Sequence, residues 1–199
     1  MTEDKEKIEL PYTFIEGENV LLTPLKMDHA NLYTKWRNNP IVRVYGRGVI
    51  PATEEQIKKQ LEPPTDWSAP TSVDFEIWHK KDKKPIGDTG IFSIDWYNRK
   101  AYIGMMIGES DYWNQHLGTE CTRLVVDFAF GELNLNKLYA TIFTPNIGSQ
   151  KCAEKNGFKL EATLKEDIFI DGEYKDTLIY SISKNQWKEL KINDKSQIL

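Results

Sequence analysis

The chain has 199 residues, of which 40% are hydrophobic, 28% charged and 12% aromatic. This apolar fraction can fill a core, which excludes a disordered or collagen-like chain, and the length fits one domain. No segment approaches the ~20 apolar residues that a membrane helix needs. The formal charge of −4 argues against broad binding to nucleic acid. The first ten residues are charged and contain no apolar signal segment. We therefore expect a cytoplasmic globular protein that binds neither membranes nor nucleic acid.

Cysteine and histidine residues give no sign of a metal site. Cys121 and Cys152 form no CxxC motif and read as reduced thiols, and Cys121 falls on the apolar face of a predicted helix. His29 and His79 are isolated and lack the spacing of metal ligands, so we expect surface or capping side chains. We predict no metal.

The first part of the chain predicts one strand and two helices. Residues 20–22 form a short strand that stops at Pro24. A helix follows over 28–38, with Asp28 as its N-cap. A second helix begins at Thr53, because Thr-Glu-Glu-Gln has the pattern of a capping box.

The second part of the chain alternates between strand and helix patterns. The segment KLYATIF has no charge after its first residue, which is typical of a buried central strand. Asp171-Gly172 between two β-rich runs predicts a hairpin turn. This alternation predicts a mixed sheet with helices on its faces, in a single domain of the α+β or α/β class. The expected elements are strands at 75–78, 86–96 and 101–107, a helix at 116–130, a strand at 137–143, a helix at 147–156, and strands at 158–170 and 174–183.

The segment from Gly104 to Thr119 passes from a strand through a loop directly into a helix. The first turn of a helix offers unpaired N–H groups and a positive dipole end, which suit phosphate oxygens. Gly118 would let the backbone approach such a ligand, or it would serve only helix–sheet packing. The segment contains neither the GK[ST] of a Walker A loop nor the three spaced glycines of a dinucleotide fingerprint.

Several ordered segments resemble the GNAT superfamily of acetyl-CoA-dependent N-acetyltransferases. Within it they resemble the RimJ/RimL-like branch. The members after which this branch is named acetylate the N-termini of ribosomal proteins. The resemblance covers about residues 18–183. It is carried by KWRNNPIVRVYG, IDWYNRKAYIG, YWNQHLGTECTRLVVDFAF and LNLNKLYATIFTPNIGSQKCAEKNGFKLEA, and then by an acidic residue and DGEYKD.

The resemblance implies an α+β fold of the α/β-type GNAT class. It is a single domain with a mixed, mostly antiparallel sheet of about seven strands, flanked by about four helices. The N-acetyltransferase domain would span 17–184, after an N-terminal extension at 1–16. A C-terminal tail at 185–199 could form a short helix.

The resemblance also implies acetyl-CoA as cofactor. Met106 and Ile107 would pair their backbone with the pantetheine amides like a short added strand. Asn146 would hydrogen-bond the pantetheine, and Ser149 would lie near the CoA sulfur. The backbone of a pyrophosphate loop and the hydroxyl of its last residue would hold phosphate; the loop residues are Asn114, Gln115, His116, Leu117, Gly118 and Thr119.

Three positions depart from the family pattern. His116 stands where the loop usually has its first glycine, so its imidazole must point away from the phosphates or contact them. Ala153 stands where many members have a tyrosine as general acid, which leaves that role to Ser149 or to water. Tyr102 stands where some members place a basic glutamate.

The chemistry requires an amine that has lost its proton and a donor for the oxyanion. A carboxylate or water must take the proton near neutral pH, and a backbone N–H can hold the oxyanion. Asp95, Glu109, Glu166 and Asp167 are candidates for the proton acceptor. An acidic residue near Glu166 recurs in this branch, so Glu166 is the predicted base.

The acceptor amine is left open by the sequence. GNAT members vary the segment corresponding to 28–64 to select it. A protein N-terminus, a polyamine and a small amine such as an aminoglycoside or amino sugar all fit, and the protein could be a monomer or a homodimer. Ala153 and Tyr102 motivate an alternative, a non-catalytic acyl-CoA-binding regulator. A second alternative is an unrelated α/β domain that binds a nucleotide.

Overall fold

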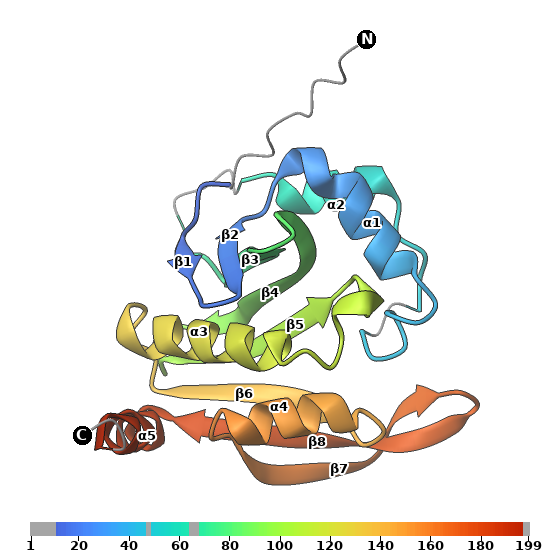
Figure 1. Cartoon of the computed structure of the whole chain (residues 1–199). Coiled ribbons are helices and arrows are strands. Elements are labelled where there is room, and N and C mark those ends of the chain that lie inside the picture. The colour runs from blue at the N-terminus through green and yellow to red at the C-terminus, as the bar shows by residue number, and fades with distance from the viewer. Residues whose placement is uncertain (1–10, 47–48, 64–67, 197–199) are drawn as a thin grey trace.

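The computed structural model describes residues 11–46, 49–63 and 68–196. These residues form one eight-stranded sheet in the order β1-β2-β3-β4-β5-β6-β8-β7 (Figure 1). Neighbouring strands are antiparallel except for β5 and β6, which confirms the predicted mixed and mostly antiparallel sheet. The strands are β1 (Ile15–Glu16), β2 (Val20–Pro24), β3 (Ser72–His79), β4 (Lys84–Asp95), β5 (Lys100–Ile107), β6 (Lys137–Phe143), β7 (Lys159–Ile170) and β8 (Glu173–Ser183). The helices are α1 (Ala30–Asn38), α2 (Glu54–Leu61), α3 (Leu117–Gly131), α4 (Ile147–Lys155) and α5 (Lys184–Ser196).

Local signals place several of these elements where the sequence predicts them. The Thr53 hydroxyl accepts from the Gln56 N–H at 3.2 Å, and the Gln56 side chain accepts from the Thr53 N–H at 2.9 Å, which completes the capping box of α2. Asp171 and Gly172 both have positive φ, 52° and 84°, as a tight hairpin turn requires. The N-cap predicted at Asp28 is wrong. Asp28 lies inside a 3-10 turn that leads into α1, and no side chain caps either element.

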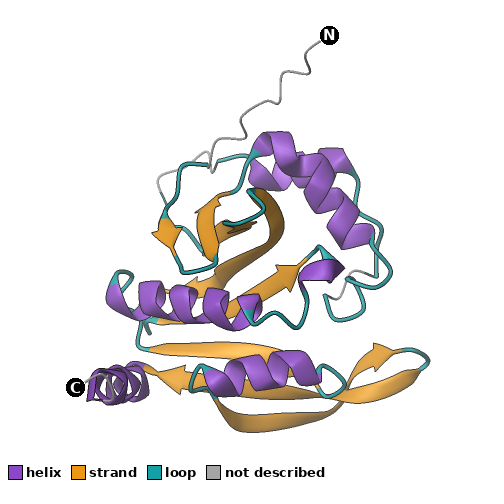
Figure 2. Ribbon diagram, viewed as in Figure 1, coloured by secondary structure: helices purple, strands orange, loops and turns teal. Residues whose placement is uncertain are grey.

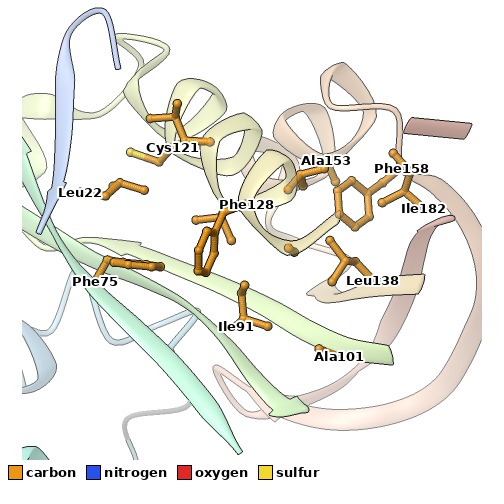
Figure 3. Close-up of a cluster of buried hydrophobic side chains, with 14 of the residues drawn as sticks. Leu22, Phe75, Ile91, Ala101, Cys121, Phe128, Leu138, Ala153, Phe158 and Ile182 are labelled. Carbon is orange, nitrogen blue, oxygen red and sulfur yellow. The ribbon is translucent and has the colours of Figure 1, made fainter. Parts of the chain in front are cut away.

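Helices cover both faces of the first half of the sheet (Figure 2). On one face, Cys121 and Phe128 of α3 pack among buried side chains such as Phe75 of β3 (Figure 3). Because successive side chains of a strand alternate between faces, Glu76 points to the other face. There Tyr33 and Trp36 of α1 pack with α2, and the side chain of Met106 packs against them. The core on the α3 face continues to Ala153 of α4 and Ile182 of β8 (Figure 3).

The sheet has a discontinuity between β5 and β6. The two strands pair in parallel only through Lys100–Tyr102 opposite Lys137–Tyr139. From residue 103 onward β5 stays paired with β4 as far as Ile107, but no strand of the described part of the chain pairs with its other side. The last residues of β5 therefore present a free backbone edge toward β6.

The described residues contain one strand that the sequence analysis does not predict, and a helix in the tail, where the sequence analysis allows a short one. β1 lies inside the segment assigned to the N-terminal extension, and it pairs with β2. α5 forms in the segment assigned to the tail, and its Trp187 Nε1 and Lys191 Nζ donate to Asp127 of α3 at 2.7 and 2.6 Å. Residues 1–10 and 197–199 lie outside the described residues, and the three-part division of the chain stays a prediction. No helix in the described ranges has the length and apolarity needed to cross a membrane.

Candidate active site

The loop between β5 and α3 has a backbone suited to an anion. Asn114 and His116 have φ of 60° and 62°, in the left-handed region that glycine adopts most readily. N–H groups next to a left-handed residue form concave anion sites, and the N-terminus of α3 adds unpaired N–H groups. The loop residues 113–116 are exposed, so such a site is open to solvent.

The side chain at the departing position, His116, lies beside a cation. Its Nδ1 is 3.5 Å from Nζ of Lys155 at the end of α4. One residue further, Asn156 Nδ2 donates to the Thr119 carbonyl of α3 at 3.2 Å. The start of α3 and the end of α4 are thus tied together, with a lysine ammonium next to the loop.

Gly118 has a packing reason of its own. A Cβ at this position would lie 2.7 Å from Cε of Met105, so the glycine leaves room for the flexible end of this side chain from β5. The neighbouring Leu117 is buried, whereas Gly118 and Thr119 are half-buried. This observation supports the packing interpretation of Gly118 and adds nothing for direct phosphate contact. Gln115 is exposed and donates to the Asp111 carbonyl at 2.7 Å.

The backbone N–H and C=O groups of Met106 do not lie on the free edge of β5. Its carbonyl faces β4 so closely that a Cβ at Gly87 would overlap it. Because peptide groups of successive residues point to opposite sides of a strand, Met105 and Ile107 carry the free edge instead. The carbonyl of Ile107 accepts from Trp113 Nε1 at 2.8 Å, which leaves its N–H on that edge. The register therefore places the backbone groups of Met105, and not those of Met106, on the free edge, and pairing of this edge with the pantetheine stays a prediction.

The start of α4 holds two predicted polar residues, Asn146 for the pantetheine and Ser149 for the CoA sulfur. Asn146 is the N-cap, and its Oδ1 accepts from the Ser149 N–H at 3.1 Å. Both side chains are half-buried. Ser149 precedes Lys155 by six residues, or ~9 Å along the helix axis. We call the exposed loop of residues 113–116 before α3 the anion loop. The anion loop and Ser149 thus lie at opposite ends of α4.

The carboxylates predicted as proton acceptors have other surroundings. Glu166 is exposed at an irregularity of the β7–β8 pairing, with φ of 50°, and its N–H donates to Asp176 at 3.0 Å. Glu109 accepts from Trp36 Nε1 at 2.7 Å, and this bond holds its pKa below the usual value. Asp95 accepts two hydrogen bonds from Asn98, which likewise lower its pKa. Hydrogen bonds thus occupy the carboxylates of Glu109 and Asp95, and a role of either as proton acceptor stays a prediction. Asp167 is exposed beside Glu166 on β7.

A cavity of about 780 Å³ lies on the other face of the sheet, between the α1–α2 region and strands β3 to β5. Its floor includes two carboxylates, Asp74 and Asp88, and it reaches Met105 and Met106 of β5. The cavity therefore meets the sheet beside the strand with the free edge. The other lining residues are Arg37, Arg43, Gly46, Ile50, Pro51, Ala52, Gln56, Ile57, Lys59, Gln60, Thr89, Gly90, Phe92 and Gly104.

Asp88 is a carboxylate that the sequence analysis missed. Burial raises its pKa from 3.8 to about 6; the Arg37 guanidinium opposes this shift, and the carboxylates of Asp74 and Glu76 add to it. The signal in the sequence is an acidic residue between glycines, Gly87-Asp88-Thr89-Gly90, inside a run that otherwise reads as a buried strand.

Glu76 lies opposite Asp88 in the β3–β4 pair. It is fully buried, and both of its carboxylate oxygens have partners. It accepts from the Tyr33 hydroxyl at 2.7 Å and also from the Trp78 indole. Nδ1 of His29 lies 2.7 Å from the same carboxylate. His29 is therefore not the surface or capping side chain that the sequence predicts, because it takes part in this buried network.

Both cysteines are free thiols, and Cys121 lies in the core, as the apolar face of its helix predicts. Cys121 is fully buried, and burial raises the pKa of its thiol strongly. Cys152 Sγ lies 3.3 Å from the Thr122 hydroxyl. Among the described residues, no group of three or more His, Cys, Asp or Glu side chains could hold a metal ion.

The acetyltransferase (GNAT) domain family matches residues 19–159, which is most of the chain. The uncharacterized N-acetyltransferase YoaA of Bacillus subtilis is 25% identical over 174 residues, covering 87% of this chain and 98% of that protein. The putative ribosomal N-acetyltransferase YdaF of Bacillus subtilis is 28% identical over 102 residues, covering 51% of this chain and 55% of that protein.

Among solved structures, the spermidine N-acetyltransferase of Vibrio cholerae in complex with CoA and spermine has a similar fold. It superposes with a TM-score of 0.77 at 20% identity, and covers 86% of this chain and 99% of that one. The family match, the anion loop and the interrupted sheet agree. The chain belongs to the GNAT family and is an acetyl-CoA-dependent N-acetyltransferase.

Proposed function

We propose that the protein transfers the acetyl group of acetyl-CoA to the primary amine of a protein or peptide N-terminus, by direct attack in a ternary complex. The observation that carries this proposal is the free edge of β5. This edge lies between the anion loop and the cavity of about 780 Å³, which acidic and basic side chains line. An acetyl donor bound along that edge would have its phosphates at the loop and its thioester near the acceptor cavity. This reading agrees with the RimJ/RimL-like branch.

The residues of the loop and of β5 fit such a donor. N–H groups from Asn114 to Gly118 would hold the pyrophosphate, with the Thr119 hydroxyl nearby. Lys155 and His116 add polar side chains to this site, since they lie together beside the loop. The edge groups of Met105 and Ile107 would pair with the pantetheine amides as an added strand does.

The thioester end of the donor would lie at the start of α4. When bound, acetyl-CoA supplies the acetyl group as an activated thioester. Asn146 would hydrogen-bond the pantetheine through its amide N–H, because its oxygen caps α4. Ser149 would donate its hydroxyl proton toward the leaving sulfur. Glu166 as the base stays a prediction, and the structure gives it no hydrogen-bonded partner for its carboxylate within the described ranges.

The charges of the cavity favour a peptide N-terminus over a polyamine. Arg37, Arg43 and Lys59 line it together with Asp74 and Asp88. A polycation would meet three like charges there, whereas an amine attached to carbonyl or carboxylate groups would find partners of both signs. The name of YdaF points to ribosomal proteins, and the spermidine enzyme of Vibrio cholerae points to the polyamine instead.

Ala153, which motivates the non-catalytic alternative, has a structural explanation. It is buried in the core between the sheet and α4, where a tyrosine would not fit without repacking. Its presence therefore reflects packing at that position and does not require loss of catalysis.

A binding and transfer experiment tests the proposal. We expect CoA and acetyl-CoA to raise the melting temperature, and ATP and NADH to leave it unchanged. Thiol release from acetyl-CoA is then measured with tetra-alanine, spermidine and kanamycin, and we expect tetra-alanine to react fastest. Absence of a shift with CoA would contradict the site. Binding without transfer to any of the three amines would favour the regulator, and faster transfer to spermidine would reverse the assignment of the acceptor.

A further inference from the structure

Asp88 lies on the floor of the cavity with its hydrogen-bonding capacity unused. No hydrogen bond joins its carboxylate to any residue within 11–46, 49–63 or 68–196. The two carboxylates nearest in the sheet differ. Asp74 accepts from the Ser72 hydroxyl at 2.8 Å, and Glu76 accepts from both Tyr33 and Trp78. Asp88 is thus a cavity carboxylate with both oxygens available, whereas Asp74 has one oxygen occupied.

The position of Asp88 relates it to the free edge. Asp88 on β4 is the register partner of Met106 on β5. Adjacent strands are ~4.8 Å apart, so the Asp88 backbone is one strand away from the edge where the acetyl donor would bind. Its side chain shares the cavity face with that of Met106, as residues directly opposite in an antiparallel pair do.

We propose that Asp88 receives the ammonium group of the acceptor in this cavity and takes its proton, in place of Glu166. The inference rests on the proposed function, because it needs the acetyl donor along the edge of β5. A carboxylate with free lone pairs, facing a cavity and partly shielded from water, binds an ammonium group well.

The transfer conserves atoms and charge. Asp88 takes one proton from the ammonium group, which leaves a lone pair on the amine nitrogen. That pair forms a bond to the acetyl carbon, the carbon–sulfur bond breaks with its electron pair on sulfur, and the sulfur gains a proton that the nitrogen loses. Asp88 finally releases its proton to water, so the products are an N-acetyl amine, the free thiol and one proton.

The charged surroundings suit this role. Burial, with the carboxylates of Asp74 and Glu76, raises the pKa of Asp88 to about 6, and the Arg37 guanidinium of α1 limits that rise. The Tyr33 hydroxyl of α1 donates to Glu76, and the charge of Asp88 adds to the raised pKa of this tyrosine. A base whose pKa lies near the working pH transfers protons most effectively. Arg43 and, from α2, Lys59 also line the cavity and complete the set of charged side chains around it.

Three variants of the full chain test the role of Asp88 against that of Glu166. D88N keeps the size of the side chain and removes its base, E166Q does the same on β7, and E55Q removes an exposed carboxylate on α2 as a control. We expect D88N to lower kcat/KM for the fastest amine by ~100-fold or more, as for loss of a general base. The melting shift with CoA should stay at the wild-type value, and E55Q should retain wild-type activity.

The pH profile and a spectroscopic measurement decide the outcome. We expect kcat/KM to rise through a pKa near 6 in wild type and E55Q, and this limb to be absent in D88N. Activity of D88N within threefold of wild type, or loss of the limb in E166Q alone, would overturn the proposal. If no amine reacts, the proposed function fails first. The carboxyl carbon of Asp88 is then titrated by NMR with ethylamine as probe; titration near pH 4 or no response to the amine would overturn the assignment.

Discussion

D88N should make the protein more stable above neutral pH, because the native fold holds this carboxylate in an unfavourable place. The folded-state pKa of about 6 exceeds the ordinary value of 3.8. Between these two values the folded protein binds more protons than the unfolded chain, so the free energy of unfolding falls as pH rises through the window. A shift of about two units at 1.36 kcal/mol each costs about 3 kcal/mol once both states are ionised.

The substitution removes this cost and keeps the shape of the side chain. Urea unfolding of wild type, D88N and E55Q at pH 4 and pH 8 measures it. We expect D88N to gain about 3 kcal/mol over wild type at pH 8, which corresponds to a melting temperature higher by ~6–12 °C. At pH 4 the gain should be small, because the native Asp88 is then neutral. A gain that is equal at both pH values, or a loss of stability at pH 8, would refute the electrostatic reasoning.

Substitutions at three other positions probe an unpaired hydroxyl, packing and backbone strain. Thr177 is fully buried, and its hydroxyl has no hydrogen-bond partner within the described ranges, so T177V should raise the free energy of unfolding by ~1 kcal/mol in urea titrations. A Cβ at Gly108 would overlap the buried Trp36 ring, so G108A should lower the melting temperature by several degrees, in line with a loss of ~2 kcal/mol. His116 is left-handed, so H116A should be less stable than H116G by ~1 kcal/mol in the same titrations. Equal stabilities of the last pair would contradict the strain argument, and an undisturbed G108A or a destabilised T177V would contradict the packing arguments.

The sequence predicts best those features whose causes lie within a few residues. The capping box at Thr53 and the Asp171-Gly172 turn depend on adjacent side chains, and the structure confirms both. Asp28 has the residue type of a cap, but the path of the chain from β2 places it inside a turn. That path is set by how α1 packs on the sheet, which no local pattern encodes.

The functional residues divide in the same way. The anion loop follows from a strand–loop–helix pattern, and its backbone conforms to that pattern with Asn114 and His116 left-handed. Which residue of β5 owns the free edge depends on the register with β4, and a shift of one residue exchanges Met105 for Met106. Asp88 needs its neighbours from β3 and α1 to become a candidate. Such groupings arise only when distant segments meet.

The short pairing of β5 with β6 also divides the chain into two consecutive pieces. Everything up to the end of α3 belongs to the β1–β5 half of the sheet, and β6, β7 and β8 form the other half from residue 137 onward. The polypeptide crosses this seam once, through residues 132–136. A nick there would leave every antiparallel pairing intact. The two fragments would meet through three β5–β6 pairs, the core on the α3 face, and side-chain hydrogen bonds from α4 and α5 to α3. We expect the two fragments to associate with each other after such a cut. A donor bound in the seam would contact both fragments and stabilise their association.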